Sequence, residues 1–383
     1  MLTSNIKFRN FNILKIKKKY SFKRESWFKK IKILETLKTN YKYGYTKNQL
    51  SKIKKNNNFR LIGMGGSILG TEAIYDFLKH KIKKKFIFIN NLNSLLDKNK
   101  KKIKATNIIV SKSGNTLETI LNSNILINKN NVFITENKNS YLYNLAKNLK
   151  AEIVDHKNYI GGRYSVLSEV GMLPAEIMGL NEKKFKRFNY LIENKIFLNQ
   201  LIKNVEAILN FTKQKKFNSV ILNYDESSVN FFKWYQQLVA ESLGKKSKGI
   251  LPVISNMPKD NHSLLQLYLD GPKNNFFTFF SVRETKSEKI NIKFLLKSHN
   301  YLKNKSFSKI LLAQKSATEN IFFKKKLPFR SFEIIRRNEE TLGELFCFFI
   351  LETILLGRAL KVNPFDQPSV ELVKKETKKI LIN

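Results

Sequence analysis

The sequence predicts an α/β protein with two domains, each a doubly wound, three-layer α/β/α unit built on a parallel sheet. The chain has 383 residues, which is more than one ordinary hydrophobic core accommodates. Short apolar runs alternate with segments of helical period, and this alternation occurs in two separate sets. Such alternation is typical of parallel sheets, whose ligands bind beyond the carboxyl ends of the strands. We place the domain boundary near residue 180, so the expected domains are residues 1–180 and 181–383.

The first set of expected strands begins at residue 59. Each strand is a short apolar run rich in β-branched or aromatic residues, and segments of helical period such as "TEAIYDFLKH" separate the strands. The strands are expected within "FRLIGMGG" (59–66), "KKFIFINN" (84–91), "TNIIVSKSG" (106–114), "NNVFITEN" (130–137) and "AEIVDH" (151–156).

The second set begins near residue 219 and follows a helical stretch at 181–211. The segment "NFFKWYQQLVAESLGK" (230–245) is expected to be a helix, and so is the long apolar segment at 341–360. The strands are expected within "NSVILNYDES" (218–227), "KGILPVIS" (248–255), "NNFFTFFSV" (274–282) and "LPFRSFEI" (327–334).

Composition indicates a soluble protein of a reducing compartment. The single cysteine, Cys347, has no partner for a disulfide within the chain. No apolar run of the kind found in signal peptides follows the basic N-terminus. The longest uninterrupted apolar core, residues 345–351, is far shorter than the roughly 20 residues that cross a bilayer. We therefore expect a cytoplasmic protein without a membrane partner.

The formal net charge of +41 raises the possibility of nucleic-acid binding. However, the lysines are spread along the whole chain together with many Asn and Ile residues, and no zinc-finger spacing, RNA-binding aromatic motif or basic zipper accompanies them. We expect no nucleic-acid partner. A positive surface would instead attract small anionic substrates.

A glycine-rich loop, "GMGGSILG" (63–70), directly follows the first expected strand and precedes a helix. Glycines allow a tight turn and close approach of the backbone to a ligand. The loop lacks the Gly-Lys-Ser/Thr ending of a Walker A motif, and Ile68 stands where the dinucleotide fingerprint needs glycine. A phosphate or sugar contact and a close-packed strand–helix turn explain this loop equally well.

The loop after the third strand of the first set combines hydroxyl groups with the start of a helix. Ser111, Lys112, Ser113 and Thr116 surround a glycine in "SKSGNTLET". Hydroxyls, backbone N–H groups and a helix N-terminus together suit a phosphate dianion. A simple helix cap would explain one hydroxyl but not three, so we favour phosphate binding. This pattern resembles the sugar-isomerase module of phosphosugar-binding proteins.

Two glycines precede Arg163 in "YIGGRYSVLSEVGMLP" (159–174). They allow the backbone to fold closely and to present the guanidinium into a cleft, where a fixed cation can stabilise an enediolate oxyanion. A structural arginine that binds loop carbonyls is the alternative for this motif alone.

Taken together, these motifs resemble the glucose-6-phosphate isomerase family. "GGRYSVLSEVGMLP" is similar to one signature of that family, and "LLGRALKVNPFDQPSVELVKK" (355–375) is similar to another. The glycine loop, "SKSGNTLET", "ESLGK" (241–245) and a segment around His262 complete a series that follows family order from about residue 59 to 375.

The resemblance implies roles for residues at matching positions. Glu241 matches the base that moves a proton between C2 and C1, and Arg163 matches the arginine beside the cis-enediolate. His262 and Lys374 match the ring-opening residues, with the histidine supplied by the partner subunit of a homodimer. The other implied contacts to the sugar phosphate are Gly66, Ser67, Ser111, Lys112, Ser113, Thr116, Gln237 and Gln367. The family uses no metal and no organic cofactor.

Spacing along the chain agrees with these roles. Gln237 and Glu241 are four residues apart and would share one face of a helix. Gln367 and Lys374 are seven apart and would share a face if their segment is helical. Two positions depart from the family pattern, because Leu243 stands where Asn is usual and Ser369 where Gly is common.

We therefore expect an enzyme that interconverts glucose 6-phosphate and fructose 6-phosphate. Two alternatives remain open at this point. One is an isomerase of broader specificity that also accepts mannose 6-phosphate. The other is a non-catalytic phosphosugar-binding regulator, which would have no need of Glu241, Arg163, His262 and Lys374 together.

Overall fold

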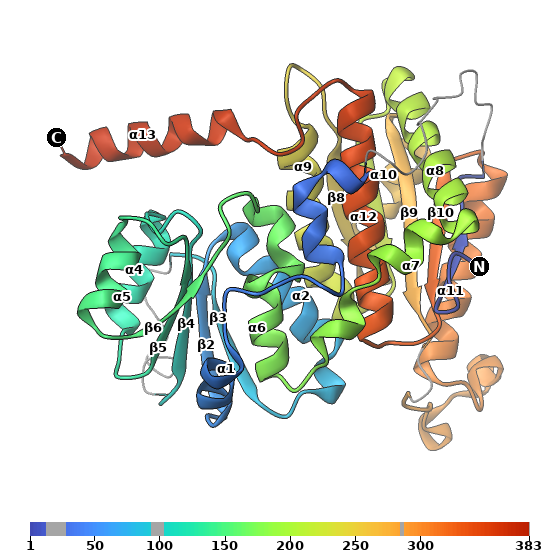
Figure 1. Ribbon diagram of the computed structural model, residues 1–383. Helices are drawn as coiled ribbons and strands as arrows, with labels where there is room; N and C mark the ends of the chain where they lie inside the picture. The colour runs from blue at the N-terminus through green and yellow to red at the C-terminus, as the bar shows by residue number, and fades with distance from the viewer. Residues whose placement is uncertain (13–27, 93–102, 284–286, 383) are drawn as a thin grey trace.

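Two sheets of five strands each form the framework of the protein (Figure 1). A computed structural model describes residues 1–12, 28–92, 103–283 and 287–382. Helices lie between the sheets and on their outer faces, which confirms the predicted α/β class with two parallel-sheet units.

The first sheet has the strand order β3-β2-β4-β5-β6 and is parallel throughout. Each of the five strands expected in this half of the chain forms. The strands are β2 (Asn58–Gly63), β3 (Lys85–Ile89), β4 (Thr106–Val110), β5 (Asn131–Thr135) and β6 (Glu152–Asp155). The helices of this half are α1 (Lys47–Lys54), α2 (Leu69–Phe77), α4 (Leu117–Leu126), α5 (Tyr141–Asn148) and α6 (Glu169–Ile177).

The second sheet has the order β1-β10-β9-β7-β8, in which only β1 is antiparallel to its neighbour. Its strands are β1 (Ile6–Arg9), β7 (Asn218–Asn223), β8 (Leu251–Asn256), β9 (Asn275–Val282) and β10 (Phe329–Ile334). The helices of this half are α7 (Phe188–Glu193), α8 (Lys195–Lys213), α9 (Val229–Leu243), α10 (Leu265–Asp270), α11 (Phe307–Lys324), α12 (Glu339–Ala359) and α13 (Pro368–Ile382).

Strand β1 was not expected from the sequence. It has four residues with alternating burial, and it pairs with β10 far along the chain, so that Phe8 lies opposite Phe332. The N-terminal strand therefore completes the edge of the second sheet. The division into domains of residues 1–180 and 181–383 stays a prediction.

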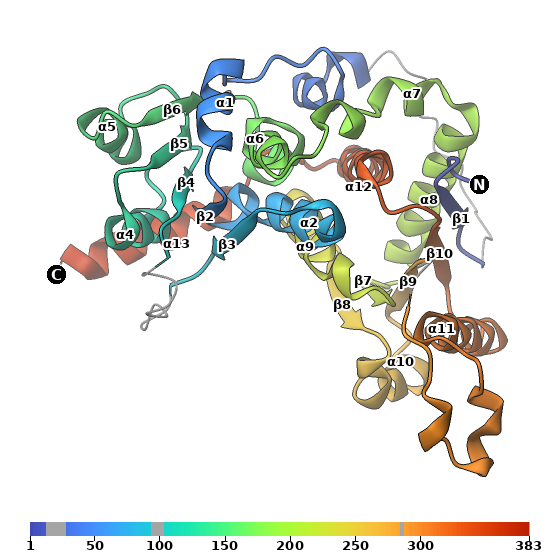
Figure 2. The same cartoon turned by 90° about the horizontal axis from the view of Figure 1, so that it is seen from below.

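The two sheets share one continuous hydrophobic core. Figure 2 shows α2, α6, α9 and α12 between the sheets, and α2 packs directly against α9. Phe59 of the first sheet and Phe280 of the second belong to the same cluster of buried apolar side chains. This packing brings the end of α9 close to the loops of the first sheet, which matters for the site described below.

Helix α12 is buried along most of its length, yet it contains two fully buried glutamates with partners. Glu344 accepts a hydrogen bond from Thr3 Oγ1 at 2.7 Å, and Glu352 pairs with the buried Arg330. Arg330 also donates to Asn204 Oδ1 at 2.7 Å. These pairs compensate the cost of burying charge inside the hydrophobic core. None of the described helices is apolar over a length that could span a membrane.

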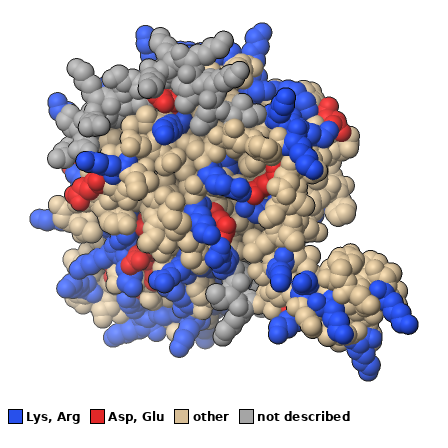
Figure 3. Space-filling model, turned by 90° about the vertical axis from the view of Figure 1, so that its right-hand side faces the viewer, with Lys and Arg blue, Asp and Glu red and all other residues tan. Residues whose placement is uncertain are grey.

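The high positive charge lies on the surface. Figure 3 shows Lys and Arg side chains scattered over one face and densest along its lower edge, with a few acidic side chains between them. A surface of this kind raises the local concentration of anionic small molecules.

Two of the described lysines, Lys186 and Lys315, are buried instead. Lys186 lies under the segment that carries Arg163, where its Nζ donates to the carbonyl oxygens of Thr36 and Leu167 and stands over the rings of Tyr41 and Tyr43. Burial lowers the pKa of Lys186 to about 7.

We predict that Lys186 makes stability rise with pH between about pH 7 and 10. In that window the unfolded chain keeps the proton that the folded chain has lost, so unfolding takes up one proton. The free energy of unfolding then rises by about 1.4 kcal/mol per pH unit from this group. In Lys186→Met this slope should be absent, so the difference between wild type and variant should grow by about 2–3 kcal/mol from pH 7.5 to 9.5.

Denaturant unfolding at several pH values measures this difference. Lys184→Met is the matched control, because Lys184 lies two residues away and is exposed. Its stability should follow the wild-type pH dependence. If the free energies of unfolding of the wild type and Lys186→Met changed in parallel from pH 7.5 to 9.5, the prediction would be contradicted.

Candidate active site

The candidate site lies where the loops of the first sheet meet the end of α9. Because β2 and β4 are adjacent parallel strands, the glycine loop after β2 and the serine-rich loop after β4 leave the same edge of the sheet. Gly66 of the glycine loop packs directly on the turn that carries Arg163, since a Cβ atom there would lie 2.1 Å from the carbonyl carbon of Gly162. Gly65 has φ +52°, and a Cβ atom at this position would lie 2.7 Å from the amide nitrogen of Gln237. Close packing thus accounts for these two glycines, and Ser67 follows them in the same short 3-10 turn.

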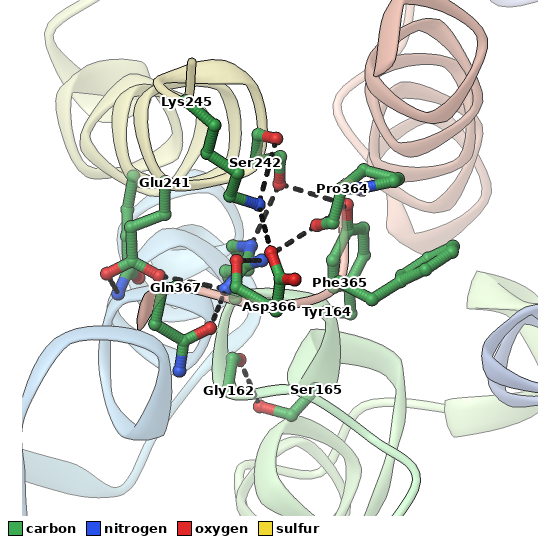
Figure 4. Close-up of polar contacts among 12 residues, drawn as sticks. Gly162, Tyr164, Ser165, Glu241, Ser242, Lys245, Pro364, Phe365, Asp366 and Gln367 are labelled. Atoms are coloured by element: carbon green, nitrogen blue, oxygen red, sulfur yellow. Dashed lines mark hydrogen bonds and ion pairs between the residues drawn. The ribbon is translucent and has the colours of Figure 1, made fainter. Parts of the chain in front are cut away.

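Arg163 is the centre of a hydrogen-bond network, and three of its partners, Glu241, Ser242 and Gln367, are labelled in Figure 4. Its side chain is 1% exposed, although it belongs to the short 3-10 segment Gly162–Leu167. Every N–H of the guanidinium has an acceptor. The acceptors are Ser242 Oγ for Nε at 2.8 Å, Glu241 at 3.2 Å and Gln367 at 2.6 Å for Nη1, and the carbonyl oxygens of Pro364 at 2.7 Å and Asp366 at 2.9 Å for Nη2. An arginine with five satisfied donors is held in one orientation.

Glu241 lies in the last turn of α9 with its side chain 30% exposed. Its Oε2 accepts from Arg163, and its Oε1 accepts from Gln237 Nε2 at 3.0 Å. The expected sharing of one helix face by Gln237 and Glu241 agrees with this hydrogen bond. The other atom of the Gln237 amide, Oε1, is buried without a hydrogen-bond donor among the described residues. A ligand hydroxyl could supply the missing donor.

The serine-rich loop has the features of an anion site. Ser111 Oγ and Thr116 Oγ1 are 2.9 Å apart, and Gly114 at φ +67° turns the loop tightly against Ser140. Thr116 is the N-cap of α4, but its side chain caps no N–H of that helix. The first turn of α4 therefore has N–H groups available for an anion. Ser113 Oγ accepts from the backbone N–H of Asn115 at 3.2 Å, within the same loop.

Lys112 connects this loop electrostatically with Arg163. Its Nζ donates to the carbonyl of Asn158 at 2.6 Å and lies 3.7 Å from Glu136. Burial lowers the pKa of Lys112; Glu136 opposes this effect, while the positive charges of Lys138 and Arg163 reinforce it. A bound anion would stabilise these neighbouring cations.

Gln367 lies beside Arg163, but it stands just before α13 and not within it. Lys374 lies on α13, which extends away from the body of the molecule (Figure 1). Its Nζ pairs with Glu371 of the same helix at 2.7 Å, and its side chain is 60% exposed. The described contacts of a single chain therefore do not bring Lys374 to Glu241.

His262 is separated from Glu241 by the length of the second sheet. It ends the 3-10 turn Lys259–His262, which follows the carboxyl end of β8, and it is exposed. Helix α9 instead ends near the start of β8, where Gln236 Nε2 donates to the carbonyl of Pro252 at 2.8 Å. Glu241 and His262 of one chain thus lie toward opposite ends of the sheet.

The two departures from the family pattern are resolved differently. Leu243 is fully buried and belongs to the main core, so this side chain packs away from the site while Glu241 faces it. Ser369 is the second residue of α13 and is exposed.

Sequence reasoning missed several residues that hold Arg163. Ser242 bonds both Arg163 and the hydroxyl of Tyr164, the latter at 2.9 Å, and the Tyr164 hydroxyl donates to the carbonyl of Pro364 at 3.0 Å. Lys245 bonds Asp366 at 2.8 Å. Each of these residues stands inside a quoted motif, which is the one signal that could have drawn attention to it. Among the described residues, no three His, Cys, Asp or Glu side chains gather as a metal site requires.

Comparison with known proteins agrees with the geometry. The family model of phosphoglucose isomerase matches residues 24–383. The glucose-6-phosphate isomerase of Campylobacter jejuni is 32% identical over 346 residues, covering 85% of each chain, and that of Mycoplasmopsis pulmonis is 36% identical over 378 residues, covering 88% of this chain and 87% of the relative. The crystal structure of a glucose-6-phosphate isomerase from Chlamydia trachomatis has the same fold, with a TM-score of 0.72 and 19% identity over 87% of this chain and 71% of the other. The chain therefore belongs to the phosphoglucose isomerase family.

Proposed function

We propose that this protein interconverts D-glucose 6-phosphate and D-fructose 6-phosphate, a step shared by glycolysis and gluconeogenesis, and that it does so in the cytoplasm. The observation that carries the proposal is the placement of the Glu241 carboxylate between Arg163 and Gln237, beside an anion-binding loop. Family membership supports the same reaction.

Glu241 acts as the base. It removes the proton from C2 of the open-chain aldose and returns it to C1 of the cis-enediolate, while the hydroxyl proton passes from O2 to O1, which gives the ketose. Its carboxylate oxygens each keep a lone pair beside their hydrogen bonds, and the partly exposed side chain can reach a carbon acid. Arg163 Nη1 faces the same position and stabilises the enediolate oxygens.

Further contacts bind and open the sugar. The hydroxyls of Ser111, Ser113 and Thr116, together with the N-terminus of α4, hold the phosphate, and Lys112 adds a positive charge. Gly66, Ser67, Gln237 and Gln367 line the sugar position. His262 and Lys374 open the ring, and no metal or organic cofactor takes part.

The assay that tests this proposal uses purified protein and measures the conversion of fructose 6-phosphate to glucose 6-phosphate and the reverse reaction. Activity is expected, and it should survive a chelator, since the proposed groups move the proton without a metal. Mannose 6-phosphate in the same assay tests the broader-specificity alternative. Binding of fructose 6-phosphate without any turnover would favour a phosphosugar-binding regulator and would overturn the proposal.

We also propose that the active unit is a homodimer in which His262 serves the site of the partner subunit. Support comes from the positions of Glu241 and His262 toward opposite ends of the second sheet of one chain. A symmetric pair can bring such positions together, because each subunit gives and receives the same contact.

Mixed dimers of Glu241→Gln and His262→Ala give a sharp prediction. Each variant alone should be nearly inactive. If His262 acts across the interface, a mixed dimer keeps one of its two sites with both native residues, so the purified mixed dimer should have about half of the wild-type activity. Co-expression with two affinity tags and coupled assay of the doubly tagged species measures this recovery. No recovery in purified mixed dimers would contradict the exchange of His262.

A further inference from the structure

Lys245, the last residue of "ESLGK", has a set of contacts that none of the roles above uses. Its Nζ lies 2.8 Å from Asp366 Oδ1, donates to the carbonyl of Ser242 at 3.2 Å and also donates to the carbonyl of Asn363. Its side chain is only 12% exposed, which is unusual for a lysine in a chain so rich in surface lysines. Figure 4 shows it reaching from the end of α9 toward the loop that follows α12.

The loop that Lys245 contacts is the one that holds Arg163. The carbonyl oxygens of Pro364 and Asp366 accept both hydrogen bonds of Arg163 Nη2, at 2.7 and 2.9 Å, and Gln367 accepts from Nη1 at 2.6 Å. Within the loop, Asn363 Nδ2 donates to Asp366 Oδ2 at 2.9 Å. The Asp366 carboxylate thus connects Lys245 with Asn363 of the same loop.

We propose that Lys245 and Asp366 are positioning residues for the proposed isomerisation: their ion pair fastens the loop 363–367 to the end of α9 and so fixes Arg163 beside Glu241. This inference rests on the proposed function. Both ends of the contact are close to the chemistry, since Lys245 is four residues after Glu241 and Asp366 adjoins Gln367.

The ion pair is suited to positioning more than to stability. Asp366 is 52% exposed, and exposed ion pairs add little to the free energy of folding. Without Lys245, however, two carbonyls and the carboxylate would lose a charged donor, and the acceptors of Arg163 Nη2 would be free to shift. A displacement of about 1 Å at a group that stabilises the transition state costs up to about 100-fold in rate. The hydrogen bond from Lys245 lowers the pKa of Asp366.

Lys248 provides a matched control within the same turn. Its Nζ donates to the carbonyl of Leu360 at 2.8 Å, at the end of α12, but it makes no described contact with loop 363–367. Lys248→Met therefore removes a similar lysine–carbonyl bond without touching the acceptors of Arg163.

The test compares kcat, KM and thermal midpoint for wild type, Lys245→Met, Lys245→Arg, Asp366→Asn, the double variant Lys245→Met/Asp366→Asn and Lys248→Met. We expect kcat to fall about 10- to 100-fold in Lys245→Met with KM within about threefold, partial recovery in Lys245→Arg, and wild-type values in Lys248→Met. The double variant should be no worse than the worse single variant, because both changes break one link.

An active wild type with unchanged kcat in Lys245→Met would overturn this inference alone. A fall in kcat that is accompanied by a proportionate fall in the thermal midpoint would also overturn it. So would a double variant in which the losses of kcat of the two single variants add. A wild type that does not convert fructose 6-phosphate would overturn the proposed function together with this inference.

Discussion

Replacing Glu241 by Gln should lower kcat for fructose 6-phosphate by about three orders of magnitude and leave KM within a few-fold. General base catalysis contributes about 10²–10⁴ in rate, and the amide cannot accept the C2 proton. The substitution keeps the size of the side chain and an oxygen that accepts from Gln237 or Arg163, so the surrounding network should persist. Steady-state kinetics in a coupled assay measures both constants.

Glu226→Gln is the matched control for this change. Glu226 is exposed and lies in the 3-10 turn that leads into α9, at the opposite end from Glu241. Its kcat should equal that of the wild type. If Glu241→Gln kept more than a tenth of the wild-type kcat while remaining folded, Glu241 would not be the base.

The fold was predictable wherever the signal is local. Nine expected strands form. Each is a short apolar run, and the segments between these runs have the different, helical period. The strand at Ile6–Arg9 has only four residues, in which buried and exposed positions alternate, and its partner β10 begins at Phe329. Pairing across such a separation leaves no local trace, so the N-terminus could not be assigned to the second sheet in advance.

The candidate site was predictable where neighbours in sequence are neighbours in space. The contact between Gln237 and Glu241 follows from helical spacing alone. The acceptors of Arg163 could not be found this way, because Ser242 and the carbonyl of Pro364 lie roughly 80 and 200 residues further along the chain. Backbone carbonyls carry no sequence signal at all.

The roles of His262 and Lys374 stay predictions for a related reason. The resemblance to the family supplies the roles, whereas the contacts described within one chain join neither residue to Glu241. A residue that acts across a subunit interface, as we propose for His262, satisfies its geometry only in the assembly.

The second large effect is expected for Arg163→Lys. Arginine supplies five donors in a fixed plane, whereas lysine supplies three from one point, so the acceptors on Ser242, Pro364 and Asp366 cannot all be satisfied. Unsatisfied buried acceptors should reduce the free energy of unfolding by about 2–4 kcal/mol. Loss of the donor that faces the enediolate should lower kcat by about 10²–10³. Denaturant unfolding and kinetics on the same preparations measure the two effects.

These two effects separate the catalytic reading of Arg163 from the structural one that its motif alone leaves open. Ser242→Ala is the comparison, because it removes the acceptor of Nε but leaves Nη1 beside Glu241. It should lose part of the stability and far less of the rate. If the rate per folded molecule fell equally in Ser242→Ala and Arg163→Lys, the role of the arginine would be structural, namely to bind the loop carbonyls. A rate loss confined to Arg163→Lys would instead require a guanidinium donor at the position where the enediolate forms.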